Sequence, residues 1–454
     1  MSAADPHRGG HGLRLVGASA GTGKTFCLTS HVGEALQSGR VDPEALVAVT
    51  FTTKAQAELE ARLRQRLLEH GAIEAAAALP LAYMGTVHAV CLRLLKEFAL
   101  EAGLAPSLDV IPAHEGRRLL QATLERELPS ELRDRLEALG RSLEIAQHPR
   151  MGRFDVVTPI EDVLSLARGN RITPEALPAM AGRSWDELSR ILPPPASDAA
   201  AIETELARAL DQAAHSLAAL GDGQQNTREA LGLLQDCARE LGRGRLRWSQ
   251  WAKLAKIKPG KRGVPLVETV RATAAAYLSH PRLHDELRSF IDCSFQAARI
   301  ALTTYTGWKA RRGLVDFVDM VDGALSLLER PEVTLDLSER LGLIVVDEFQ
   351  DTSPIQLALF LRLHALAGAS VWVGDRKQCI FEYAGADPDL MDAIARWVVE
   401  SGGQAEQLAR NYRSRPELVV LCSQVFGGAF QGQGIAASEV ATAAHRASSE
   451  GLEA

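Results

Sequence analysis

The chain has 454 residues, 46% hydrophobic and 24% charged, with a formal net charge of -7, an ordinary balance for a globular protein of roughly two to four domains. No run approaches the length of about eighteen apolar residues, and segment 1–12 lacks the apolar core of a signal peptide, so no membrane association is expected. Six scattered cysteines without a CxxC pair argue against a zinc site or a disulfide framework and favour a reducing cytoplasm.

The first predicted element is an apolar strand over Leu13–Val16. Small residues after it would let backbone N–H groups curl around phosphates, while Lys24 supplies a positive charge and the Thr25 hydroxyl ligates Mg²⁺. A helix predicted over Lys24–Gln37 presents its positive N-terminal end to the same phosphates. The match to the phosphate-loop pattern consists of Ala18, Ser19, Ala20, Gly21, Thr22, Gly23, Lys24 and Thr25.

Further strands alternate with helices along the chain. A strand over Leu46–Val49 precedes a helix over Lys54–Glu69, and short apolar runs at Leu343–Val346 and Val371–Val373 each end in a turn that carries a carboxylate. Such alternation predicts a parallel α/β sheet, in which ligands bind at the carboxyl ends of the strands.

The middle of the chain, residues 101–300, has a different pattern. Segments such as Ala199–Leu220 and Thr227–Leu241 show helical apolar spacing and are separated by breakers such as Pro259-Gly260. We therefore expect a mostly helical domain inserted into the α/β domain.

One stretch within this helical region, Arg243–Arg262, holds eight basic residues and no acidic one, together with Trp248 and Trp251. One interpretation is a surface that contacts the phosphates of duplex DNA. The other is a solvated helix face with two core tryptophans. The sequence leaves both open.

The strand over Leu343–Val346 ends in Asp347 and Glu348. A phosphate-loop ATPase needs a carboxylate that holds Mg²⁺ and a second one that orients and deprotonates the attacking water. We expect Asp347 to take the first role and Glu348 the second.

With these two motifs, the chain resembles superfamily 1 DNA helicases of the UvrD/Rep type, and the wording of the phosphate loop is most similar to the RecB/AddA branch. The resemblance runs from about Leu13 to about Ser423. It implies a RecA-like P-loop NTPase fold, ATP and Mg²⁺ as cofactors, and hydrolysis coupled to movement on single-stranded DNA in repair or recombination. A 3′ to 5′ polarity is expected from the family.

Several further segments carry the resemblance. Thr50–Leu59 looks like motif Ia, Gly85–His88 like motif Ib, and Val373–Phe381 like motif III. In the family these segments meet single-stranded DNA, where aromatic rings stack on bases of any sequence. The resemblance implies that the DNA-contacting residues are Phe51, Thr52, Thr86, His88, Phe381 and Tyr383.

The same resemblance adds residues to the nucleotide site. Gln378 in motif III would sense the γ-phosphate. In the segment Leu408–Ser414, similar to motif IV, Tyr412 would stack on adenine and Arg413 would reach the γ-phosphate as an arginine finger. Asp316–Asp319 resembles a short motif that lines or supports this site.

The chain also departs from the family pattern. Segment 1–12 contains no glutamine to read adenine, and Ala384, beside Glu382, stands where the family has an arginine. Motifs V and VI are not found before Ala454, so we expect a fragment or a truncated chain in which ATP binding survives better than translocation.

The expected domains are the first part of the RecA-like ATPase domain at 1–100, the inserted helical domain at 101–300, the second ATPase part at 301–425, and a truncated second motor domain or tail at 426–454. Expected partners are single-stranded and duplex DNA, and a nuclease-helicase partner subunit or the missing C-terminal half. Two alternatives remain: a non-translocating, nucleotide-dependent DNA-binding module, and a phosphate-loop NTPase acting on a small molecule or protein, which has no use for the DNA motifs.

Overall fold

The computed structural model describes residues 12–105, 107–145, 155–379, 388–431, 435 and 440–446. They group into two units. Unit 1 draws on residues 1–112, 169–171 and 309–454, and unit 2 draws on residues 113–168 and 172–308. Each unit has its own hydrophobic clusters, and the two are described separately.

Unit 1 is built on a six-stranded sheet in which every pairing is parallel. The strand order is β3-β2-β6-β7-β1-β8, so connections cross over the sheet rather than joining neighbours by hairpins. This confirms the expected α/β fold. The strands are β1 (Leu13–Ala18), β2 (Leu46–Thr50), β3 (Tyr83–Thr86), β6 (Leu343–Val346), β7 (Ala369–Gly374) and β8 (Gln404–Leu408).

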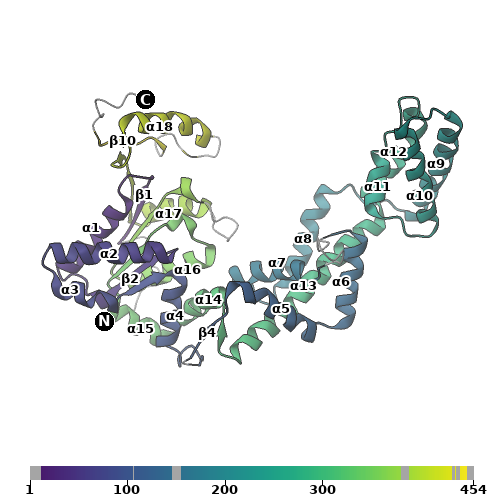
Figure 1. Ribbon diagram of the computed structural model, residues 1–454. Helices are drawn as coiled ribbons and strands as arrows, with labels where there is room; N and C mark the ends of the chain where they lie inside the picture. Colours follow the sequence, from purple (N-terminus) through teal and green to yellow (C-terminus); the bar gives the residue numbers. More distant parts are fainter. Residues whose placement is uncertain are drawn as a thin grey trace. The chain divides into compact units, whose positions relative to one another are not determined.

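Helices cover both faces of this sheet (Figure 1). Successive side chains of a strand point to opposite faces, so Val47 and Val49 of β2 join one apolar cluster while Leu46 and Ala48 join the other. One face packs against α1 (Lys24–Gln37), α2 (Thr53–Glu69) and α3 (Ile73–Ala78). The other packs against α4 (Val87–Glu97), α14 (Phe317–Leu327), α15 (Pro331–Arg340), α16 (Pro354–Leu366) and α17 (Pro388–Glu400).

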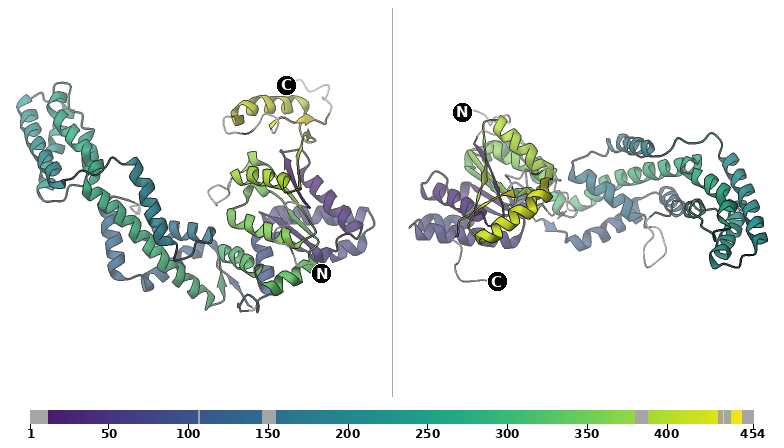
Figure 2. Two further views of the ribbon diagram at one scale, coloured as in Figure 1. Left: turned by 180° about the vertical axis from the view of Figure 1, so that it is seen from behind. Right: turned by 90° about the horizontal axis from the view of Figure 1, so that it is seen from above.

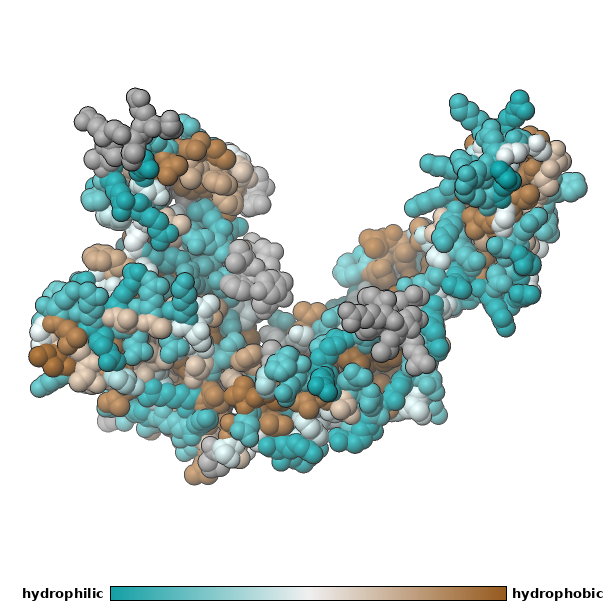
Figure 3. Space-filling view, in the orientation of Figure 1, coloured by the Kyte–Doolittle hydropathy of each residue, from teal (hydrophilic) through white to brown (hydrophobic). Residues whose placement is uncertain are grey.

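The remaining elements of unit 1 are short pairings and one helix. β4 (Asp109–Val110) pairs with β5 (Leu314–Val315), and β9 (Arg410–Asn411) pairs with β10 (Ala443–Ala444). The helix α18 (Pro416–Gln431) exposes several large apolar side chains, which appear as a hydrophobic area in Figure 3. In the described part of the chain, no helix is long and apolar enough to cross a membrane.

Unit 2 is helical in its described residues, as Figure 2 shows from two sides. One apolar cluster gathers around α5, α6, α7 and the middle of α13, and a second around α9 to α12. The helices are α5 (Ala113–Glu127), α6 (Ser130–Ser142), α7 (Val157–Gly169), α8 (Leu177–Ile191), α9 (Ala199–Leu220), α10 (Gln225–Gly242), α11 (Trp248–Ala255), α12 (Glu268–Ala275) and α13 (Pro281–Ala310).

The two tryptophans of the basic stretch belong to the core of unit 2. Trp251 is fully buried and Trp248 is 6% exposed, and both contact the buried ring of His280 edge to face. The Trp248 indole N–H donates to Glu286 at 2.8 Å. For these two side chains the core interpretation is therefore correct, and they offer no face to nucleic acid bases.

Candidate functional site

The loop between β1 and α1 is shaped by two glycines. Gly21 and Gly23 have φ angles of 81° and 86°, a left-handed conformation that side chains disfavour. Gly23 is the N-cap of α1, and no side chain caps that end or places an acid in its first turn. The first N–H groups of the helix are therefore left for an anion.

A cavity of about 470 Å³ opens beside this loop. It receives residues from the turns after β1, β6 and β7 and from the segment around β9, which agrees with the rule that ligands bind at the carboxyl ends of parallel strands. The predicted residues that line it are Ser19, Ala20, Gly21, Gly23, Lys24, Thr25, Glu348, Gln378, Tyr412 and Arg413. Sequence analysis did not single out four others, namely Phe26, Glu58, Arg62 and Arg446.

Lys24 and Glu348 form an ion pair in this cavity, with 2.5 Å between Nζ and Oε2. The two residues are 324 positions apart in the chain, so the sheet topology brings them together. Glu348 also has a φ of 56°, which is unusual for a residue other than glycine. The charge of the loop lysine is thus neutralised by the carboxylate that follows β6.

Asp347 lies beside Glu348 but is not among the residues that line the cavity. It is 7% exposed, and its Oδ1 accepts the Glu348 N–H at 3.0 Å. Burial raises the pKa of the Asp347 carboxyl from 3.8 to about 6, the negative charge of Glu348 acts in the same direction, and the Lys24 ammonium opposes both. A buried carboxylate in this state would gain from a bound cation.

Two predicted loop residues also lie behind the cavity wall. Ala18 is buried at the end of β1, and Thr22 is buried with its hydroxyl donating to the Ser19 carbonyl at 2.7 Å. Both shape the loop from inside and have no surface in the cavity. Their positions are compatible with a structural part in phosphate binding, since the loop backbone is the group that would contact phosphate.

Asn411 attaches the predicted motif IV to the phosphate loop. Its side-chain amide donates to the Ala20 carbonyl at 3.1 Å and accepts the Arg413 N–H at 2.9 Å. The Tyr412 N–H donates to the Gly21 carbonyl at 2.8 Å. Sequence analysis gave Asn411 no role, although its place directly before Tyr412, as the polar residue with both a donor and an acceptor, is a usable signal.

The residues predicted to meet DNA are only partly accounted for. Thr52 caps α2 and Thr86 caps α4, each accepting a backbone N–H. Phe51 is half-buried against the core. Burial lowers the pKa of the His88 imidazole, whose ring packs on Phe317 with 4.7 Å between centroids.

Thr50 of β2 is paired with Thr86 of β3, so the predicted motifs Ia and Ib begin at adjacent strand ends. The predicted contacts Phe381 and Tyr383 lie outside the described residues, as do Glu382 and Ala384. Two of the six predicted DNA contacts therefore have no structural account.

The Asp316–Asp319 segment does not line the cavity. Asp316 caps α14 by accepting the N–H groups of Val318 and Asp319, and both carboxylates pair with the buried Lys309 at 2.7 and 2.5 Å. In the structure this segment supports the start of α14.

Comparison with known protein families agrees with this arrangement. A model of the UvrD/REP helicase N-terminal domain matches residues 4–397. The chain belongs to this family. The UvrD/REP match includes the phosphate loop, the carboxylates after β6 and Gln378, and it spans both units.

Several similar proteins are described as one of the subunits of an ATP-dependent helicase/nuclease. The relative from Geobacillus kaustophilus is 27% identical over 89% of this chain and 37% of its own length. The one from Pelotomaculum thermopropionicum is 29% identical over 91% and 37%, and that from Moorella thermoacetica 27% over 89% and 33%. The chain thus spans little more than a third of the length of these curated relatives.

Proposed function

We propose that this chain carries the ATP-binding part of a DNA helicase or translocase and hydrolyses ATP when single-stranded DNA is bound. The observation that carries the proposal is the ion pair between Lys24 and Glu348 in a cavity that Gln378 and Arg413 also line. A loop lysine, a carboxylate and an arginine around one cavity are the groups that phosphoryl transfer to water requires.

The residues present fit a magnesium-bound ATP. A Cβ on Gly21 would lie 2.9 Å from atoms of Asn411 and Arg413, so only glycine keeps the loop backbone this close to its surroundings. The Thr25 hydroxyl and the Asp347 carboxylate are oxygen ligands of the kind that magnesium prefers. When bound, the metal would neutralise charge on the phosphates.

The remaining steps fall to side chains of the chain itself. Lys24 would leave Glu348 and contact the phosphates, because a triphosphate offers it more negative charge than one carboxylate. Glu348, freed from Lys24, would orient the attacking water and accept its proton. Arg413 would stabilise the charge that develops on the transferred phosphoryl group, and Tyr412, which is 47% exposed, would offer its ring to adenine.

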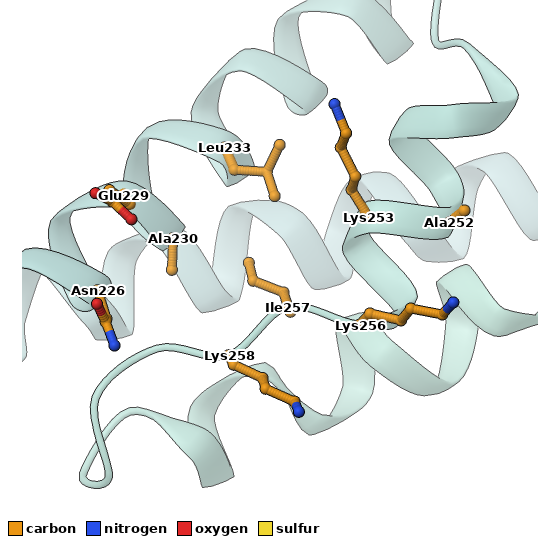
Figure 4. Close-up of a pocket in the computed structure, with 9 residues that line it drawn as sticks. All are labelled: Asn226, Glu229, Ala230, Leu233, Ala252, Lys253, Lys256, Ile257 and Lys258. Carbon is orange, nitrogen blue, oxygen red and sulfur yellow. The ribbon is translucent and has the colours of Figure 1, made fainter. Parts of the chain in front are cut away.

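Duplex DNA is a second proposed ligand, through unit 2. Among its described residues, the basic stretch forms ion pairs only at Arg243 and Arg247. Figure 4 shows a pocket between α10 and α11 in which Ile257 points toward Ala230 and Leu233, while the lysine side chains extend away from these apolar groups. The lysines are Lys253, Lys256 and Lys258. Such uncompensated charge in an acidic protein suits phosphate contact.

The relatives' description as subunits of a larger helicase/nuclease supports one further proposal. We expect this chain to act with a partner subunit or with additional motor sequence, since stepping needs two domains that open and close on ATP. The alternative function is a module that binds nucleotide and DNA without moving.

The deciding experiment measures steady-state ATP hydrolysis by the whole chain with and without an oligothymidine. The proposal expects stimulation by the DNA, and a loss of at least about 100-fold in turnover for Lys24→Ala and for Glu348→Gln. Nucleotide binding without DNA-stimulated hydrolysis would favour the non-translocating module. Unchanged turnover in either variant would refute the assigned roles.

A further inference from the structure

A buried glutamine lies between the two turns that shape the nucleotide cavity. Gln350, 4% exposed, follows Glu348 by two residues. Its side-chain NH₂ group donates to Glu348 Oε2 at 2.8 Å, and its side-chain oxygen accepts the backbone N–H of Asp375 at 2.8 Å. One side chain thus connects the turn after β6 to the turn after β7.

Asp375 continues this connection to Gln378. Its carboxylate accepts a hydrogen bond from the side-chain amide of Gln378 at 2.6 Å and pairs with Lys377 at 2.8 Å. Gln378 and Glu348 both line the nucleotide cavity. A continuous run of hydrogen bonds therefore joins these two residues through Gln350 and Asp375.

The chemistry of its neighbours fixes the orientation of the Gln350 amide. If the amide were turned over, its oxygen would face the Glu348 carboxylate and its NH₂ group would face the N–H of Asp375, giving two repulsive contacts. Packing also limits its movement, since a Cβ on Gly374 would lie 3.0 Å from both the backbone nitrogen and the side-chain oxygen of Gln350. The side chain is held as a directed bridge.

Glu348 needs such a bridge for two reasons. Its left-handed backbone is disfavoured by about 1–2 kcal/mol for a residue with a Cβ. In addition, Oε2 is shared between Lys24 and Gln350. If Lys24 moves to the phosphates of a bound nucleotide, the Gln350 amide stays as the side-chain donor that fixes the Glu348 carboxylate.

We propose that Gln350 is a positioning residue for ATP hydrolysis, which holds the Glu348 carboxylate in place and ties it to the turn that carries Gln378. The inference rests on the proposed ATPase function. It adds that the base cannot shift independently of the β7 turn, so that a change at Gln378 is transmitted to the residue that activates water.

The test compares Gln350→Glu with Gln356→Glu in the whole chain. Gln356 is a matched control, because its side-chain oxygen also accepts a backbone N–H, that of Ser353 at 3.0 Å, but its amide donates nothing to Glu348. Gln350→Glu keeps the acceptor for Asp375 and places a second carboxylate against Glu348. We expect kcat with single-stranded DNA to fall roughly 10- to 100-fold, as for a misplaced catalytic group, while the KM for ATP stays within about threefold.

Gln350→Ala removes the bridge without adding charge, and serves if the glutamate variant does not fold. Its kcat should fall while the affinity for a fluorescent ATP analogue stays near that of the parent protein. The inference is overturned if either folded variant keeps kcat within twofold of the parent, or if kcat and nucleotide affinity fall together, which indicates a merely structural role. A parent protein without DNA-stimulated hydrolysis would instead overturn the proposed function.

Discussion

Replacing Asp347 with asparagine should make the metal-free protein more stable. Asp347 is 7% exposed, and its burial raises the pKa of the carboxyl from 3.8 to about 6. This difference corresponds to about 3 kcal/mol of unfavourable free energy when the carboxylate is charged in the folded state. Asparagine is uncharged and keeps an oxygen that can accept the Glu348 N–H. We expect a gain of about 1–3 kcal/mol.

The sign of the pH dependence follows from the raised pKa. Above about pH 6 the folded protein bears the full cost of the charge, and below that value the carboxyl takes up a proton and the cost is relieved. The advantage of Asp347→Asn should therefore be complete at pH 7.5 and should shrink as the pH falls from about 6 toward 3.8. In the presence of magnesium and ATP, the same variant should lose hydrolysis.

Calorimetric melting without magnesium or nucleotide measures this difference, and a gain of 1 kcal/mol should raise the melting temperature of unit 1 by about 2 °C or more. Asp336→Asn is the control, because its surface ion pair with Arg340 contributes little and should change stability by less than about 0.5 kcal/mol. A variant at position 347 that melts below the parent at pH 7.5, or an advantage that grows on acidification, would refute the reasoning.

Three further substitutions probe other parts of the molecule. Asn411→Ala should weaken binding of a fluorescent ATP analogue by about tenfold, because two hydrogen bonds that hold motif IV to the phosphate loop are removed; unchanged affinity would exclude this role. Joint replacement of Lys253, Lys256 and Lys258 by alanine should lower duplex DNA affinity and reduce the salt slope by about 0.9 for each phosphate that the variant no longer neutralises; a salt titration that matches the parent would contradict it. Trp251→Ala should destabilise unit 2 by about 3–5 kcal/mol in urea unfolding, and a smaller loss than for an exposed residue would argue against its place in the core.

The parts of the fold that sequence predicted well are those where local pattern and burial agree. The strands over Leu13–Val16 and Leu46–Val49 are runs of apolar residues buried on both faces, which is the pattern of inner parallel strands. The predicted helix Lys24–Gln37 has the observed bounds, because a glycine with a positive φ precedes it and fixes its start. In these segments the local pattern alone determined the element.

The strand β8 was not predicted, and its composition explains why. Gln404–Leu408 alternates polar and small residues, and four of its five residues are exposed. It is an edge strand that pairs with β1 alone, so nothing in its own sequence demands burial on both faces. The short strand β3 includes Gly85 and has the same difficulty, because its partner β2 determines its conformation.

The candidate site divides along the same line. Lys24 and Glu348 were predicted from local motifs, whereas the hydrogen bonds of Gln350 and Asn411 depend on which turns the sheet brings together. Both amides act as a donor toward one segment and an acceptor toward another, so their function is defined only by two partners far apart in the chain. A local pattern can identify a charged group that chemistry requires. It cannot identify the uncharged side chains that hold two such groups in register, and in this cavity those side chains are the ones through which nucleotide and DNA signals would have to pass.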